Sequence, residues 1–142
     1  MLDRSLTVNP NSAVGWQWNA WLHLWTGQTD TALRYFETSL RLTPREQRAN
    51  PFMGMGVAHF FSGRYEQART ILLQSLQEKP NWVPTYRFLA ACLVHMGRLD
   101  EAREIVATIR SMSNELIPTA TQWRHAEHRE LYLSGLRIAA QS

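Results

Sequence analysis

Apolar side chains occur along the chain in six blocks with helical spacing, and short polar segments separate the blocks. The first block, about 12–26, is apolar on nearly all sides, which is typical of a buried helix. The second, about 30–43, has apolar residues every three or four positions, which predicts a partner helix. Because about three residues join these two helices, we expect them to be antiparallel. The same two-helix pattern follows twice more, at about 51–62 and 65–78 and at about 82–96 and 99–112.

The three helix pairs are copies of one another at the level of single residues. Each copy has a glycine after its first helix, and the glycines Gly27, Gly63 and Gly97 are 36 and 34 residues apart. An alanine follows each glycine after five residues and a large apolar residue after nine, giving Ala32, Ala68 and Ala102 with Phe36, Leu72 and Val106. Self-similarity at a period of about 34 residues indicates a helical solenoid, in which each repeat packs on its neighbours.

The middle copy contains local signals that predict how its first helix begins and packs. We expect Asn50 to cap this helix and Pro51 to stand in its first turn, where a missing N–H costs nothing. Gly54 and Gly56 lie inside the helix, where glycine lowers helix propensity by about 1 kcal/mol relative to alanine. We therefore expect these glycines to permit close approach by a neighbouring helix.

The two ends of the chain depart from the repeat. Residues 2–10 superpose on 36–44 at an offset of 34, which predicts the second helix of an earlier repeat. We expect the chain to be a fragment of a longer polypeptide, the alternative being a natural cap that looks like a half repeat. After Met112 the pattern changes, and one longer or two broken helices are expected over 119–141. The predicted single domain, 1–142, thus comprises a half repeat at 1–10, repeats at 11–46, 47–80 and 81–113, and a C-terminal cap at 114–142.

Residues shared by the copies resemble the tetratricopeptide repeat (TPR) family across about residues 2–112; in the first copy they are Trp16, Ala32, Phe36 and Pro44. The chain departs from the family where Asn19-Ala20 replaces the usual Leu-Gly, and where the third copy lacks its closing proline. The resemblance implies an all-α, right-handed solenoid of antiparallel helix pairs. It would have about three repeats, an N-terminal half repeat and a C-terminal capping helix.

A narrower resemblance rests on several short runs, namely Asn9-Pro-Asn-Ser-Ala, the Trp-rich first helix, Ala58-His-Phe-Phe61, Lys79-Pro-Asn-Trp82 and Gly135-Leu-Arg. They look like a bacterial group in which TPR arrays form the C-terminal part of class III adenylate/guanylate cyclases, or of proteins with an N-terminal winged-helix regulator. The resemblance implies an accessory role in signal transduction. No cyclase catalytic residue can be placed in this chain, so a cyclase activity is implied only for a full-length parent.

Composition limits the compartment and the partners. The chain has 44% hydrophobic and 19% charged residues, no 18-residue apolar window and no secretory signal, so we expect a cytoplasmic protein without a membrane partner. The single cysteine, Cys92, excludes an internal disulfide and stands in an apolar run, where we expect a packed thiol. The net charge of +3 is small, and acidic residues interleave with the fourteen arginines and Lys79. Nucleic-acid binding is therefore the least favoured hypothesis.

Candidate catalytic residues are few. His23 and His59 occupy the same repeat position, which favours a packing role shared by two copies. His125 and His128 share one helical face but lack the His-Glu-x-x-His zinc spacing, and no third ligand is evident. No serine stands in a nucleophile-elbow context. We predict no enzyme activity, no metal and no cofactor.

A binding groove is the stronger prospect, because in TPR arrays the first helix of each pair lines the concave face. The resemblance then implies the following lining residues: Gln17, Trp21, Leu24, Trp25, Met53, Val57, Phe60, Phe61, Arg87, Ala91, Val94 and His95. Aromatic patches of this size usually mark interaction sites. Two alternatives remain open: these aromatics are simply core, or the C-terminal helix folds back into the groove.

The residues of the predicted groove indicate which class of ligand it would bind. Some TPR domains grip a peptide carboxylate with lysines and asparagines, whereas this groove offers Gln17, Trp21 and Gly54, and Lys79 is the only lysine. An apolar or amphipathic helix fits better. The leading hypothesis is a non-catalytic protein–protein interaction or regulatory module that binds a peptide, a partner protein or another domain of its own polypeptide. The alternative is a homodimerisation module that pairs through the half repeat and the aromatic groove.

Overall fold

The computed structural model of the chain describes residues 12–118, 120 and 122–141. These residues form seven α-helices and one short 3₁₀ turn, η1 (Arg45–Gln47), with no strand among them. The α-helices are α2 (Ala13–Trp25), α3 (Thr29–Leu42), α4 (Ala49–Phe61), α5 (Tyr65–Glu78), α6 (Val83–His95), α7 (Leu99–Met112) and α8 (Ala126–Ala140). The predicted half repeat at 1–10 lies outside the described residues.

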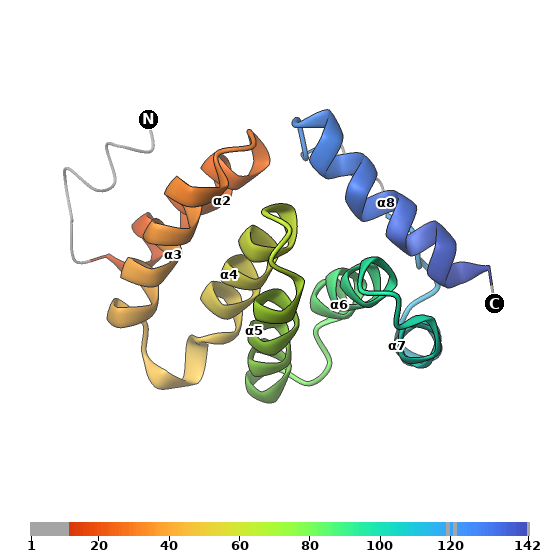
Figure 1. Ribbon diagram of the computed structural model, residues 1–142. Helices are drawn as coiled ribbons and strands as arrows, with labels where there is room; N and C mark the ends of the chain where they lie inside the picture. Colours follow the sequence, from red (N-terminus) through yellow and green to blue (C-terminus); the bar gives the residue numbers. More distant parts are fainter. Residues whose placement is uncertain (1–11, 119, 121, 142) are drawn as a thin grey trace.

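Helices α2 to α7 form three pairs that stack in chain order (Figure 1). Within the stack α3 packs on α4 and α5 packs on α6, so each pair contacts the next one. Helix α8 then returns to pack mainly on α6 and to a smaller extent on α7. The prediction of an all-α helical solenoid is confirmed, and the six predicted helices of the repeats begin and end within two residues of the observed ones.

The turn inside each pair depends on a glycine. Gly27, Gly63 and Gly97 have φ angles of 90°, 79° and 80°, a left-handed conformation that glycine adopts without a steric penalty. The residue after each glycine donates its N–H to a carbonyl of the last helical turn, as in the 2.8 Å bond from Gln28 to His23. This turn closes the first helix and reverses the chain.

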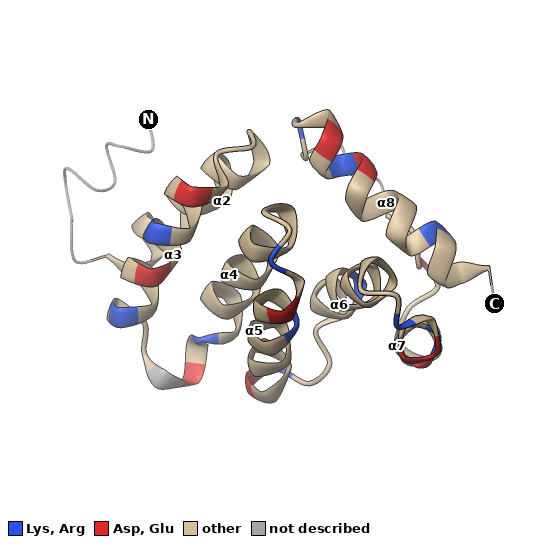
Figure 2. Cartoon of the chain, in the orientation of Figure 1, with Lys and Arg blue, Asp and Glu red and all other residues tan. Residues whose placement is uncertain are grey.

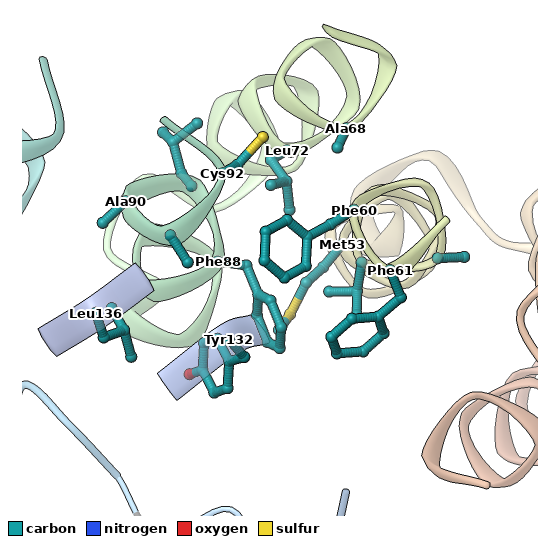
Figure 3. Packing of buried hydrophobic residues seen from close by; sticks show 14 of the residues in the cluster. Met53, Phe60, Phe61, Ala68, Leu72, Phe88, Ala90, Cys92, Tyr132 and Leu136 are labelled. Carbon is teal, nitrogen blue, oxygen red and sulfur yellow. The ribbon is translucent and has the colours of Figure 1, made fainter. Parts of the chain in front are cut away.

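Close contacts between helices form the core around α4. A Cβ atom on Gly54 would overlap the ring of Phe36 on α3, and one on Gly56 would lie 2.7 Å from Cγ of Leu72 on α5. Both glycines therefore admit a neighbouring helix, as predicted. The buried cluster continues towards α6 and α8, where Phe60 and Phe61 lie next to Phe88 (Figure 3).

A buried hydrogen bond recurs in two of the three repeats. The Ser39 hydroxyl donates to the backbone carbonyl of Ala13 at 2.9 Å, and the Ser75 hydroxyl donates to that of Ala49 at 2.8 Å. Each serine stands twelve residues after the turn glycine, and the third repeat has Ile109 at this position. The bond joins the end of the second helix to the start of the first within each pair.

One local prediction, the Asn50 cap, is wrong. Helix α4 begins at Ala49 after Arg48, and Asn50 lies in its first turn, where its side-chain oxygen accepts a 2.8 Å bond from the Trp21 indole N–H. Long-range pairing with the indole thus takes the side chain that was expected to cap the helix. After Met112 the described residues contain a single helix, α8, one of the two expected arrangements, and it begins at Ala126 after the buried Trp123.

The two helices of each pair differ in their content of charged residues. The first helices, α2, α4 and α6, contain one charged residue, Arg87, whereas α3, α5 and α7 carry many (Figure 2). A helix without charge on any side is suited to burial. We call α2, α4 and α6 the inner helices, and α3, α5 and α7 the outer helices.

Candidate binding groove

A groove of about 430 Å³ lies between the inner helices and the C-terminal part of the chain; we call it the inner groove. Its lining residues are Gln17, Trp18, Trp21, Trp25, Asn50, Met53, Trp82, Pro84, Arg87, Phe88, Pro118, Gln122, Trp123 and Tyr132. Five of the six tryptophans of the chain are among them. Tryptophan is enriched where binding energy concentrates in protein interfaces, so this gathering favours recognition.

A row of equivalent residues crosses the groove. Gln17, Met53 and Arg87 each stand ten residues before the turn glycine of their repeat, and all three line the groove. Because the repeats stack in order, equivalent positions on the inner helices lie side by side. Together with Trp21 and Trp25, they are the five of the twelve predicted lining residues that line this groove.

Three of the predicted lining residues are core residues instead. Leu24, Val57 and Phe60 have no exposed surface. Phe60 lies between its neighbour Phe61, Tyr65 and Phe88, with ring centroids within 6.0 Å. The inner helices are apolar on all sides, so their sequence pattern does not separate the face towards the outer helices from the face towards the groove.

Two more predicted lining residues are covered by the C-terminal part of the chain. The Phe61 ring stacks on His128 with centroids 4.4 Å apart. The Nε2 atom of His95 lies 2.9 Å from the backbone carbonyl oxygen of Leu131, a contact in which the ring N–H donates. Ala91 and Val94 are likewise buried. The inner face of the third repeat is therefore in contact with α8 rather than open.

The Trp123 side chain is the main insertion into the groove from the C-terminal part of the chain. It is 3% exposed, and its ring lies 5.2 Å from Phe61, 5.5 Å from Phe88 and 6.3 Å from Trp21 between centroids. The three partners come from three different inner helices. Edge-to-face packing of this kind adds to the gain from burial alone.

Helix α8 is held close to α6. A Cβ atom on Gly135 would lie 2.9 Å from the Cα atom of Ala91, so only a residue without a side chain permits this approach. The Tyr132 ring stacks on Phe88 at 4.1 Å, with the planes 10° apart (Figure 3). The sequence left open whether the aromatic residues are core or whether the C-terminal helix folds back into the groove. At the third repeat, the C-terminal segment partly fills the groove.

Arg87 supplies the charge of the groove. Its guanidinium donates to the backbone carbonyl of Glu115 at 2.8 Å and lies 3.8 Å from the Glu115 carboxylate. The Arg87 side chain is 13% exposed, and it is the only charged side chain among the lining residues, all of which the structure describes. The groove thus combines an aromatic surface with one cation, which suits a ligand carrying a carboxylate.

The opposite end of the groove is open. Trp18 on α2 is 54% exposed, which is unusual for so large an apolar side chain. Trp82, at the start of α6, also lines this part of the groove and is half-buried. Sequence reasoning missed both residues and Trp123, which it assigned to the cap. The concentration of tryptophan in the first helix was the signal that could have drawn attention to Trp18.

The histidines have packing contacts. His23 bonds through Nδ1 to the carbonyl of Asn19 at 2.8 Å, and the Nδ1 of His59 accepts from Arg64 Nε at 2.8 Å. Burial, with the neighbouring charge of His125 second, lowers the pKa of His128. Within the described residues no group of three or more His, Cys, Asp or Glu side chains is placed to hold a metal ion.

Similarity to known proteins supports this architecture. Residues 60–114 match the family model described as Tetratricopeptide repeat, which supports the TPR family for the second and third repeats. The fold is similar to the crystal structure of MamA, with a TM-score of 0.72 and 16% identity over 99% of this chain and 83% of MamA. It is also similar to PilW, described as a widely conserved type IV pilus biogenesis factor, with a TM-score of 0.72, 17% identity and 99% of this chain covered. The match covers 63% of the PilW chain, less than two thirds. No curated protein matches the chain in sequence.

Proposed function

We propose that the chain is a non-catalytic protein–protein interaction module that holds a peptide segment of a partner protein in the inner groove. The observation that carries this proposal is the gathering of five tryptophans around a groove of about 430 Å³, with Trp18 more than half exposed at its open end. Large exposed apolar patches on soluble proteins usually mark interaction sites. The TPR match in residues 60–114 supports the same class of function.

The charge of the groove specifies the peptide further. Arg87 is a cation among neutral lining residues, so a bound peptide that carries a carboxylate near an apolar anchor would gain a charge-assisted hydrogen bond. A basic peptide would instead place a second cation beside Arg87 and lose affinity. The partner segment is therefore apolar with a nearby acidic residue.

We further propose that this module is the accessory region of a cytoplasmic bacterial signalling protein, such as an adenylate/guanylate cyclase. Support for this assignment comes from the resemblance of the short runs that include Ala58-His-Phe-Phe61 and Lys79-Pro-Asn-Trp82. Among the described residues, no helix is long and apolar enough to cross a membrane. The catalytic step would then belong to another domain of the parent protein.

A peptide selection tests the groove directly. Random peptides displayed on phage are selected on the immobilised chain, and the enriched peptides are synthesised and titrated by calorimetry. We expect an aromatic or aliphatic residue beside an aspartate or glutamate. Trp18→Ala and Trp82→Ala should each weaken binding about tenfold, because hot-spot truncations commonly cost more than 1 kcal/mol.

The matched control is Leu73→Ala on α5, an outer helix, because Leu73 is 37% exposed but does not line the groove. Its affinity for the selected peptides should equal that of the unchanged chain. Arg87→Gln should weaken only those peptides that carry the acidic residue. If no peptide is enriched, or if the groove variants bind as well as the control, the groove is not a peptide site.

A further inference from the structure

The C-terminal segment of the chain occupies the inner groove in the manner of a bound peptide. We propose that Glu115 and Trp123 fill the two subsites of the groove, and that the outside partner is a peptide with a carboxylate and a large aromatic residue that displaces them. This inference rests on the proposed function, since it names the partner and the regulation of the same site. The chain's own segment then serves both as a competitor and as a template for the ligand.

The aromatic subsite is the site that the Trp123 ring fills. Trp123 is 3% exposed, whereas Gln122 and Arg124 on either side of it are exposed. Ala120 is 5% exposed and its carbonyl accepts the Trp123 backbone N–H at 3.1 Å, so the segment also buries a small residue. Trp123 is the large aromatic anchor among the described residues of the segment, as in a peptide whose single aromatic residue carries most of the contact.

The walls of this subsite come from outside the C-terminal segment. Trp21, Phe61 and Phe88 contact the inserted ring and belong to α2, α4 and α6. All three repeats therefore contribute to a site for one aromatic side chain. The same walls would accept an aromatic residue of a partner once Trp123 leaves.

The carboxylate subsite is the part of the groove at Arg87, where Glu115 lies. Arg87 is 13% exposed in its side chain, whereas its acidic partner Glu115 is 64% exposed. The cation is thus fixed inside the groove and the anion lies at the rim, where solvent and an outside carboxylate can compete for it. A partner's carboxylate would replace only the 3.8 Å contact with the Glu115 carboxylate, while the 2.8 Å bond from Arg87 to the Glu115 backbone carbonyl stays in place, so the buried cation keeps a partner.

Two hydrogen bonds of the described residues near Trp123 show how the segment before α8 is held. Beside the Trp123 ring, the Arg124 N–H donates to the backbone carbonyl of Trp25 at 2.9 Å, at the end of α2. Arg129 donates to the carbonyl of Trp123 at 3.2 Å, a bond that lies within the C-terminal part of the chain and would move with it. The contacts to be released at the aromatic subsite include, among the described residues, the Trp123 ring and the bond from Arg124 to the Trp25 carbonyl, while α8 has its own contacts with α6.

The test uses the chain's own segment as the probe. A fluorescein-labelled synthetic peptide of residues 113–125 is titrated against the full chain, against Trp123→Ala and against the outer-helix control Leu73→Ala, with anisotropy as the readout. We expect Trp123→Ala to bind the peptide at least about tenfold more tightly than the other two proteins, because only this variant has a vacant aromatic subsite. A peptide in which the tryptophan is replaced by alanine should not bind.

A second variant keeps the proposal testable if Trp123→Ala does not fold, as judged by circular dichroism. Arg124→Pro removes the N–H that bonds to the Trp25 carbonyl and truncates no buried side chain. We expect this variant to bind the 113–125 peptide severalfold more tightly than the unchanged chain. If a folded Trp123→Ala or Arg124→Pro binds the peptide no better than the unchanged chain, Trp123 is a core residue and the inference is wrong.

The phage-selected peptides separate this inference from the proposed function. If the unchanged chain binds them through Trp18 and Trp82, and Trp123→Ala binds neither them nor the 113–125 peptide better, self-occupancy is wrong and the peptide site stands. If neither protein binds any peptide, both proposals fail. Tighter binding of the selected peptides by Trp123→Ala, with competition by the 113–125 peptide, supports both.

Discussion

The inner faces of the first and third repeats differ in what covers their equivalent positions. Trp21 and Ala91 both stand six residues before the turn glycine of their repeat, and Trp25 and His95 both stand two residues before it. The tryptophans of the first repeat line the groove and contact the inserted Trp123 ring, whereas Ala91 and His95 are in contact with helix α8 itself. Side-chain size contributes to this difference, because the small side chain of Ala91 permits the close approach of Gly135 on α8. Trp21, at the equivalent position of the first repeat, has a large side chain.

The largest expected effect is the difference in stability between variants of a buried tryptophan, Trp123, and an exposed one, Trp18. Trp123→Ala should lower the free energy of unfolding by about 3–5 kcal/mol, because it removes a buried ring with its aromatic contacts. Trp18→Ala should change it by no more than about 0.5 kcal/mol, since that side chain is 54% exposed. Urea denaturation followed by circular dichroism measures both, and equal losses would contradict the comparison.

The next effect concerns the close approach of α8 to the third repeat. Gly135→Ala places a Cβ atom 2.9 Å from the Ala91 Cα, and we expect a loss of about 1–3 kcal/mol from overpacking. Ser134→Ala is the matched control, because that hydroxyl bonds only within α8, to the Leu131 carbonyl. Hydrogen exchange should accelerate in α8 of the glycine variant and stay unchanged in α3; a stabilised variant would show that helix propensity outweighs the contact.

A smaller effect is expected for the serine bond that the first repeat has and the third lacks. Ser39→Ala removes the bond to the Ala13 carbonyl and should cost about 1 kcal/mol. Ser75→Ala should cost a similar amount in the second repeat. Thermal unfolding measures both changes. An unchanged unfolding midpoint would mean that these hydrogen bonds make no net contribution to the stability of the chain.

The smallest expected effect is a dependence of α8 docking on pH. Burial first, and the adjacent His125 second, lower the pKa of His128, while Glu127 acts weakly in the opposite direction. The folded chain therefore disfavours the protonated ring, so docking is fully stable above about pH 6.5 and weakens as the pH falls through the lowered pKa. Tryptophan fluorescence between pH 8 and pH 5 should report this change.

The variants for this pH test distinguish two histidines. His128→Gln should remove most of the change in fluorescence. His59→Gln should leave it in place, although the pKa of His59 is also lowered, by burial and by Arg64, because the hydrogen bond and the charged neighbours of His59 come from Arg64 and Glu37 in the second and first repeats. The opposite result would assign the dependence to the second repeat rather than to α8.

The sequence predicts the repeats well because each signal in them is local. A glycine at a fixed spacing marks each turn, and its positive φ in the structure explains why no other residue stands there. The row of Gln17, Met53 and Arg87 follows from the same spacing. These features depend on residues within one repeat or on the stacking of identical units, so periodicity is enough to place them.

The sequence does not predict which part of the inner face is covered. Trp123 lies in a segment without periodicity, and its position depends on contacts with α2, α4 and α6, up to about a hundred residues away. The inner helices are apolar all round, so Leu24 and Phe60 could not be separated from true lining residues. Asn50 differs from its predicted role for the same reason, because its partner Trp21 belongs to another repeat.

The bond from Arg124 to the Trp25 carbonyl has a consequence for how the molecule unfolds. In an open solenoid each repeat contacts only its neighbours, so the ends can fray and the array can lose its units one at a time. Here the C-terminal segment ties the first repeat to the last, and the Trp123 ring touches the inner helices of all three. The chain should therefore unfold cooperatively in a single transition, with helix content and tryptophan fluorescence lost together.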